Sequence, residues 1–185
     1  TVSTSPTMIY FGQEVGEPGA EDAGFGDPSR TSIFDYIGVP QHQKWMNGGK
    51  FDGGQLSDNE KALRNYYSEV LNFTRKSPAL MGEYMELHSF NRSQNPAYTN
   101  KAFAFARWDE SKKLIVVTNF DEFQSVKTTL KLSPELLKAW NLEKGEREIK
   151  EVMFGKKKTK LRVTDSGAEI ELDFGPWESA VFEVR

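Results

Sequence analysis

The sequence contains no cysteine, and this absence excludes disulfide bonds and metal sites built from thiolates. Histidine is scarce as well. The two histidines, His42 and His88, lie far apart and match neither a metal-ligand spacing nor a catalytic triad. No stretch approaches the ~20 consecutive apolar residues that a membrane-spanning helix needs. We therefore expect no cofactor in this chain and no membrane partner.

An excess of basic residues is also missing. The chain has 24 Lys and Arg against 27 Asp and Glu, which gives a net charge of −3 with the two signs interleaved. No basic face is available to attract nucleic acid, so we expect no nucleic-acid partner. The one basic run, at residues 156–160, lies between two apolar runs and predicts a solvated hairpin turn rather than a binding patch.

The sequence is rich in large aromatic residues. It contains thirteen Phe, six Tyr and four Trp, and 37% of its residues are hydrophobic. This composition is typical of a globular chain that can bury a sizeable core.

The first 56 residues are irregular and rich in glycine. The run Met8-Ile9-Tyr10-Phe11, stopped by Gly12, is typical of a buried strand in a parallel sheet. A long loop with little periodicity follows up to Gly54. Because a single strand of this kind cannot bury itself, we expect its partner strands to lie in chain outside this sequence.

The clearest helix is predicted over residues 57–76. Ser57 and Glu60 have the spacing of a capping box at its start, and Ser77-Pro78 ends it. One face of this helix carries an apolar stripe at helical spacing, formed by Leu63, Tyr66, Tyr67, Val70, Leu71 and Thr74.

From residue 83 onward the pattern changes to short strands separated by turn residues. A short helix is predicted over 134–140, with Pro134 at its first position. The predicted strands are rich in aromatic and β-branched residues and cover 84–90, 102–108, 114–120, 126–132, 149–154, 160–164, 168–174 and 179–184. Short strands at this density favour an antiparallel β-sandwich.

Three parts of the chain, in order, resemble the α-amylase family (glycoside hydrolase family 13). Residues 6–14, which read P-T-M-I-Y-F-G-Q-E, are similar to the last strand of the family's catalytic barrel. The end of the predicted helix and the segment after it resemble the final barrel helix at Leu71, Arg75, Pro78, Ala79, Leu80 and Gly82. The predicted sandwich that follows is similar to the family's C-terminal domain.

The resemblance implies a mainly β chain with two parts. Residues 1–82 would be the strand–loop–helix remnant that ends a (β/α)8 barrel, and residues 83–185 would form an antiparallel Greek-key β-sandwich. The family places its catalytic Asp, Glu and Asp on barrel strands four, five and seven, and the family's G-x-R-x-D and N-H-D stretches are absent here. The resemblance thus implies the C-terminal part of a retaining α-glucan hydrolase that is inactive alone.

The same resemblance implies two partners, the preceding barrel of the same polypeptide and, in the intact enzyme, an α-glucan such as starch. A polysaccharide substrate favours a secreted or periplasmic location, although the sequence does not fix the compartment. Two alternatives stay open at this point. The chain would otherwise be an autonomous carbohydrate-binding module or a purely structural β-sandwich.

Five residues are candidates for contact with, or support of, a sugar cleft. The segment Asp27-Pro28-Ser29-Arg30 resembles the family's donor-side sugar contact, so Asp27 and Arg30 would bind sugar hydroxyls. A plain Asp-Pro turn is the alternative. Trp45 lies in the Gly-rich loop and would either line the cleft or pack locally. Gln13 and Glu14 end the predicted strand and would hold loops beneath the site.

An acidic cluster in the same loop carries no predicted chemistry. Glu14, Glu17, Glu21 and Asp22 resemble an acid–base pair or a calcium site, but their spacing fits no EF-hand loop. We expect them to be hydrated, and calcium is implied only for the intact enzyme, not for this chain. Other side chains are assigned to packing: His88 to a strand surface, and the core or a hinge for Trp108, Trp140 and Trp177.

Overall fold

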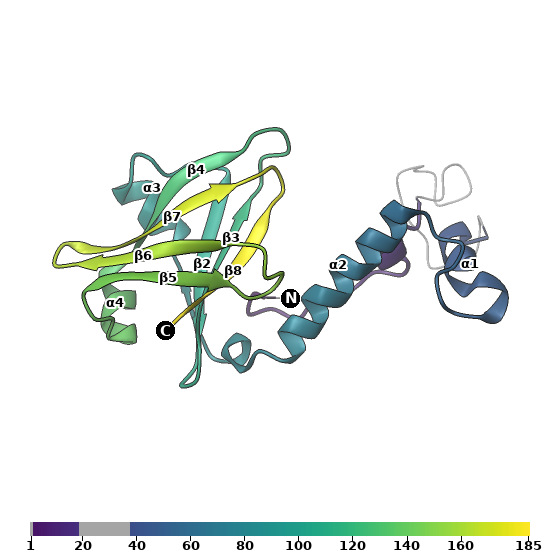
Figure 1. The fold of residues 1–185 in the computed structure, drawn as a ribbon, viewed down its shortest axis with the longest axis horizontal. Helices are drawn as coiled ribbons and strands as arrows, with labels where there is room; N and C mark the ends of the chain where they lie inside the picture. Colours follow the sequence, from purple (N-terminus) through teal and green to yellow (C-terminus); the bar gives the residue numbers. More distant parts are fainter. Residues whose placement is uncertain (1, 19–37) are drawn as a thin grey trace. The chain divides into compact units, whose positions relative to one another are not determined.

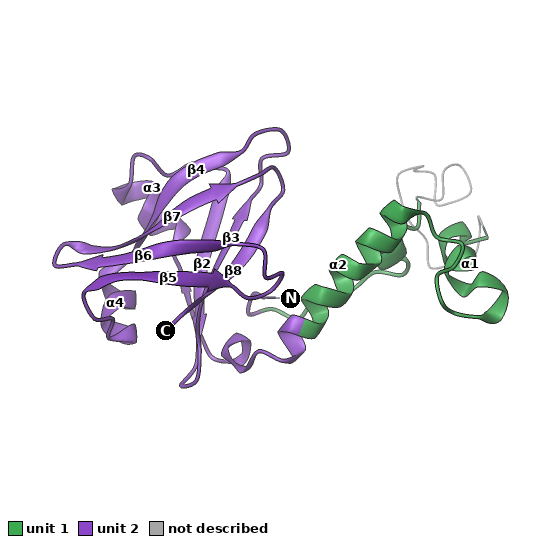
Figure 2. Ribbon diagram, in the orientation of Figure 1, with its two compact units in different colours: residues 1, 5–72 green, residues 2–4, 73–185 purple. Residues whose placement is uncertain are grey.

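A computed structural model of the chain describes residues 2–18 and 38–185 and divides into two compact units (Figures 1 and 2). Unit 1 comprises residues 5–72, and unit 2 comprises residues 2–4 and 73–185. The division falls inside helix α2 (Asp58–Arg75), earlier than the boundary predicted after residue 82. The domain boundary after residue 82 stays a prediction.

Unit 1 contains the short helices η1 (Gln13–Val15), α1 (Pro40–Met46) and η3 (Asn47–Gly49), and most of α2. The strand predicted at Met8–Phe11 does not form, and Met8 is 81% exposed. The prediction was wrong because a strand needs a neighbour, and the described part of unit 1 contains no other strand. The backbone N–H of Tyr10 instead donates to Gln13 Oε1 at 3.1 Å.

Helix α2 confirms the prediction for residues 57–76 and its capping box. The backbone N–H of Ser57 donates to Glu60 Oε2 at 2.6 Å, and the N–H of Glu60 donates to Ser57 Oγ at 3.3 Å. The apolar stripe is only partly buried: no residue of α2 falls in the buried class, and Tyr66 and Leu71 are 47% and 38% exposed. Among the described residues, no helix is long and apolar enough to cross a membrane.

Unit 2 is an antiparallel sheet of eight strands, as the mainly β prediction required. The strands are β1 (Glu83–Glu86), β2 (Ala102–Trp108), β3 (Lys113–Asn119), β4 (Val126–Leu132), β5 (Gly145–Glu151), β6 (Lys158–Thr164), β7 (Gly167–Phe174) and β8 (Ser179–Val184). Their order in the sheet is β1-β2-β3-β8-β5-β6-β7-β4. Strand β4 lies beside β7 rather than β3, which is a Greek-key arrangement.

The sheet curls into two halves, β1-β2-β3-β8 and β5-β6-β7-β4 (Figure 1). The halves are joined by a short pairing of β5 with β8, in which Lys150 faces Glu183 and Glu151 faces Phe182. The main core draws residues from both halves, including Ala104, Ile115, Leu130, Leu161 and Ile170. Helix α4 (Pro134–Trp140), found as predicted, adds Leu136 and Trp140 to this core.

A second, smaller apolar cluster covers the other face of the first half. It joins Phe105, Leu114, Val116 and Val181 to Ala79 and Leu80 of η4 (Pro78–Met81). This contact explains why small and apolar residues occupy the segment 78–82. A Cβ at Gly82 would lie 2.1 Å from the carbonyl oxygen of Trp108, so the chain passes too close to β2 for any larger residue.

A buried arginine fastens the same segment. Arg107 of β2 is 2% exposed, and its Nη2 donates to the carbonyl oxygens of Leu80 and, at 3.4 Å, of Gly82. Burial lowers the pKa of this guanidinium. The side chain therefore fixes η4 on the sheet through two backbone acceptors.

Helix α3 (His88–Gln94) replaces the end of the strand predicted over 84–90. Asn91, fully buried, donates to the carbonyl oxygen of Lys131 at 2.8 Å and accepts from its N–H at 2.8 Å. Asn95 donates to the carbonyl of Thr129 at 2.6 Å. These amides pair with the free edge of β4 as a further strand would, which explains the helix at this position. The strand-surface assignment of His88 is wrong: it begins α3.

Glu151 is a buried carboxylate at the junction of the two halves. It is 5% exposed, and its oxygens accept hydrogen bonds from the backbone N–H groups of Met153 (2.7 Å), Phe154 (2.9 Å), Lys156 (3.3 Å) and Val181 (3.4 Å). The donors belong to the β5–β6 connection and to β8. One side chain thus holds this connection and ties β5 to β8.

Replacing Glu151 with Gln tests this arrangement. The amide group of Gln turns one acceptor into a donor that faces other donors, so we expect Glu151→Gln to lower the free energy of unfolding by about 2–4 kcal/mol. Urea denaturation followed by tryptophan fluorescence measures this change. Glu171→Gln, on the exposed face of β7, is the matched control and should change stability by less than about 0.5 kcal/mol. Equal effects of the two substitutions would contradict the role given to Glu151.

Candidate functional site

A groove of about 520 Å3 lies within unit 1, between the segment that leads into η1 and one face of α2. Glu14, His42 and Arg64 contribute its charged or titratable groups. Its remaining lining is largely aromatic and apolar, with Ile9, Tyr10, Phe11, Tyr67 and Leu71. The groove therefore combines the faces of aromatic rings with hydrogen-bonding side chains of negative and positive charge.

His42, which lines the groove, is held in place by Glu17, which lies beside the groove. The Glu17 carboxylate accepts from His42 Nδ1 and from the His42 backbone N–H, each at 3.1 Å, and from the Gln41 N–H at 3.4 Å. The Glu17 side chain is only 4% exposed. The His42 ring stacks on Phe11, with the ring centroids 4.3 Å apart. This pair joins the η1 segment to the start of α1.

Glycine at position 12 leaves the space that the contact between Glu17 and His42 needs. Gly12 has φ +80°, and a Cβ there would lie 2.4 Å from Glu17 Cβ and 3.1 Å from the His42 ring. Gly12 is thus required both by its left-handed backbone and by the close approach of Glu17.

Trp45 of α1 packs locally. Its ring lies 5.7 Å from the Phe51 ring in a T-shaped contact, and the Arg64 guanidinium lies over it at 5.0 Å. Of the two alternatives for Trp45, local packing describes these contacts, and its ring is not part of the groove lining. Arg64 connects the two regions because it contacts Trp45 and also lines the groove.

The other predicted site residues have different outcomes. Glu14 lines the groove, and Gln13 closes the turn before it through the bond to Tyr10. Asp27 and Arg30 lie outside the described residues, as do Glu21 and Asp22. The sugar contacts assigned to Asp27, Arg30 and Trp45 therefore stay predictions. Among residues 2–18 and 38–185, no group of three or more His, Asp or Glu side chains is arranged to hold a metal ion.

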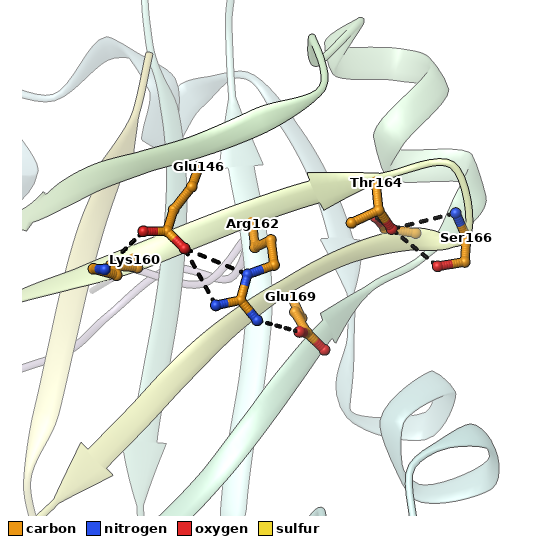
Figure 3. Close-up of polar contacts among 7 residues, drawn as sticks. Glu146, Lys160, Arg162, Thr164, Ser166 and Glu169 are labelled. Carbon is orange, nitrogen blue, oxygen red and sulfur yellow. Dashed lines mark hydrogen bonds and ion pairs between the residues drawn. The ribbon is translucent and has the colours of Figure 1, made fainter.

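A second polar cluster lies on the exposed face of β5, β6 and β7 (Figure 3). Glu146 accepts from Lys160 at 2.7 Å and from Arg162 at 3.2 Å, and Arg162 also donates to Glu169 at 3.4 Å. The hydrogen bonds from Lys160 and Arg162 hold the pKa of Glu146 below its usual value. Glu146 is therefore ionised at neutral pH and unsuited to act as a general acid.

The neighbouring turn in Figure 3 joins β6 to β7. Thr164 Oγ1 lies 2.9 Å from Ser166 Oγ, and Thr164 pairs with Gly167 across the turn. The contacts of this face are mutual pairs between strands. They describe a solvated sheet surface rather than a binding site.

Two features escaped prediction from the sequence. The Glu17–His42 pair joins residues 25 positions apart and has no local pattern. Trp177, expected in the core or at a hinge, is instead 61% exposed, with Phe120 at 53% and Phe123 at 81%. Trp140 and Trp108 do contribute to the core as expected, with centroids 5.8 Å apart.

No protein-family model and no curated protein sequence matches the chain. Its fold, however, is similar to parts of solved α-amylase-family enzymes. The α-amylase of Geobacillus thermoleovorans in complex with acarbose matches with a TM-score of 0.54 and 15% identity, over 100% of this chain and 31% of that one. The cyclomaltodextrin glucanotransferase CldA gives a TM-score of 0.52 and 19% identity, over 96% and 29%.

A variant of AmyP in complex with maltotriose gives a TM-score of 0.50 and 14% identity, over 72% of this chain and 22% of that one. The chain thus spans less than a third of the length of these enzymes. At these identities the likeness concerns the fold. It agrees with the resemblance carried by the sequence motifs.

Gly12→Ala tests the geometry of the groove. The new Cβ displaces Glu17, so we expect the backbone N–H groups of Gln41 and His42 to lose their acceptor and exchange at least tenfold faster with solvent. Hydrogen–deuterium exchange of peptides covering α1 measures this. Gly48→Ala is the matched control, because Gly48 also has positive φ (+65°), but no atom of the described chain lies within 4 Å of where its Cβ would be. Similar exchange in the two variants would contradict the contact.

Proposed function

We propose that the chain is the C-terminal part of a retaining, α-glucan-acting glycoside hydrolase of the α-amylase family and does not catalyse by itself. The observation that carries this proposal is the agreement between ordered motifs and fold. The segments at residues 6–14 and 71–82 and the following sandwich occur in the family's order, and the fold matches a family enzyme over the full chain.

The incomplete burial of apolar residues in unit 1 supports a preceding barrel. A strand and a helix at the end of a (β/α)8 barrel bury their apolar residues against the other strands and helices. Here Met8 is exposed in a segment without strand partners, and α2 has an apolar stripe with no buried residue. Both features fit a chain whose remaining packing surfaces belong to a preceding barrel of the same polypeptide.

The described carboxyl groups whose pKa is shifted fit the proposed absence of catalysis. Retaining glycosidases need two carboxyl groups about 5 Å apart, one of them protonated at working pH. Where the pKa of a described carboxyl is shifted, hydrogen bonds lower it, at Asp52, Glu60, Asp109, Asp121 and Glu146. Such groups stay ionised. The proposed role of this chain is therefore to complete the barrel and its cleft.

Within the intact enzyme, the groove residues would support the sugar site. Glu17 and His42 hold the loop after the last barrel strand, and Gln13 and Glu14 position it. We assign the sugar contacts themselves to Asp27 and Arg30, and keep Trp45 as a third candidate although its ring also packs against Phe51 and Arg64. A carboxylate and a guanidinium suit adjacent sugar hydroxyls.

Hydrolysis assays on two polypeptides test the proposal. The 185-residue chain, incubated with soluble starch or maltoheptaose, should release no reducing ends above a heat-treated sample. The full open reading frame that contains it should hydrolyse the same substrates and release the α-anomer first, since the proposed mechanism retains configuration. Hydrolysis by the 185-residue chain, or none by the full reading frame, would refute the proposal.

A further inference from the structure

Three aromatic side chains point to solvent from two adjacent loops of unit 2. Phe120 and Phe123 lie in the β3–β4 connection, and Trp177 lies in the β7–β8 connection. They are 53%, 81% and 61% exposed. The Trp177 backbone N–H donates to the Asp121 carbonyl at 3.0 Å, so the two loops are in direct contact. We call these three side chains the aromatic platform.

A buried asparagine fixes both loops. Asn119 is 1% exposed, and its Nδ2 donates to the carbonyl oxygens of Gln124 and Gly175, each at 2.9 Å. Its Oδ1 accepts from the Asp121 N–H at 2.9 Å. One buried side chain therefore hydrogen-bonds to both loops. The exposed side chains of these loops are not needed to hold them together.

Each loop is also closed by its own carboxylate. Asp121 accepts from the N–H groups of Phe123 (2.9 Å) and Gln124 (3.0 Å), and Glu178 accepts from the Gly175 N–H at 2.7 Å. Trp177 has φ +54°, a conformation that costs energy for a bulky residue. The fold thus holds an exposed tryptophan in a strained position on a rigid support.

The size of the aromatic platform argues against a protein partner. Aromatic side chains have about 150–250 Å2 each, so the three exposed portions together amount to roughly 400 Å2. A stable protein interface buries about 800 Å2 on each partner. Rings on loop tips are large enough, however, to stack against the apolar faces of two or three pyranose rings.

A groove of about 870 Å3 with both polar and apolar lining begins at the strand ends that carry these loops. Its three lysines are paired with carboxylates: Lys127 lies 3.2 Å from Asp173, Lys157 lies 2.7 Å from Glu178, and Lys158 lies 3.1 Å from Glu148. Glu171 adds a further carboxylate to the lining. Thr128 and Thr159 also line it. Because the cations are already matched by carboxylates, the groove favours a neutral ligand rich in hydroxyl groups over an anion.

We propose that the aromatic platform and this groove bind an α-glucan chain, at a surface of the sandwich separate from the groove of unit 1. Trp177 and Phe123 stack on successive glucose rings, while the side chains of the groove hydrogen-bond to hydroxyl groups. The choice of an α-linked glucan rests on the proposed function. The presence of a sugar surface rests on the exposed rings, their rigid support and the paired charges.

Calorimetric titration of the 185-residue chain with maltoheptaose tests the inference. We expect saturable binding, a loss of affinity of about tenfold or more in Trp177→Ala, a smaller loss in Phe123→Ala, and near-complete retention in Trp177→Tyr, which keeps a stacking ring. Met81→Ala removes an apolar side chain that is 91% exposed elsewhere in unit 2 and should bind like the wild type. Thermal unfolding confirms that each variant is folded.

Specific results would overturn the inference. No binding of maltoheptaose at millimolar concentration, or equal affinities of Trp177→Ala and the wild type, would do so. If the full reading frame still hydrolyses maltoheptaose in that case, the proposed function stands while the platform fails. Cellohexaose is the comparison ligand. Preference for this β-linked chain would overturn the α-glucan assignment, whereas preference for maltoheptaose supports it.

Discussion

The closure of unit 2 depends on one short junction and on the carboxylate buried beside it. The two halves of the sheet meet through a brief pairing of β5 with β8, yet they enclose the whole main core between them. Glu151 adds hydrogen bonds to this short pairing, because its carboxylate accepts them from backbone N–H groups of the β5–β6 connection and of β8. A charged acceptor buried among several donors holds its geometry more strongly than neutral pairs do.

The two units differ in how completely their own residues bury their apolar side chains and pair their backbone groups. Unit 2 closes its core and covers the edge of β4 with the side chains of Asn91 and Asn95. Unit 1 has a well-fixed join between Glu17 and His42, but the apolar stripe of α2 has no buried residue. This contrast agrees with the proposed function, in which the end of a barrel precedes the sandwich. The contrast is also why the proposed function needs preceding chain, whereas a sugar surface on the sandwich does not.

Features set by local patterns were predictable from the sequence. Strands β2, β4 and β8 and helix α4 have the predicted bounds, and the capping box of α2 forms as expected. Alternation, turn residues and caps act over a few positions, so a single sequence reveals them.

Features set by distant contacts were not predictable. Helix α3 owes its place to bonds between Asn91 and Lys131, 40 positions away, and the aromatic run 84–90 gives no sign of them. The strand at Met8–Phe11 was predicted from composition, but a strand forms only where a neighbour supplies hydrogen bonds. For the candidate site, the sequence singled out Gln13 and Glu14, whose role beneath a cleft stays a prediction. It gave no sign of the pairing of Glu17 with His42, because that pairing depends on the fold of the intervening chain.

Asn119 holds the two loops, whereas other residues of the loops form their exposed surface. It carries the backbone of both loops from below, while the side chains at 120, 123 and 177 contribute little to the buried interior. Mutations at these outer positions can therefore accumulate without loss of the fold. A directed library confined to positions 120, 123 and 177 would alter this surface while leaving the hydrogen bonds of Asn119 to both loops in place.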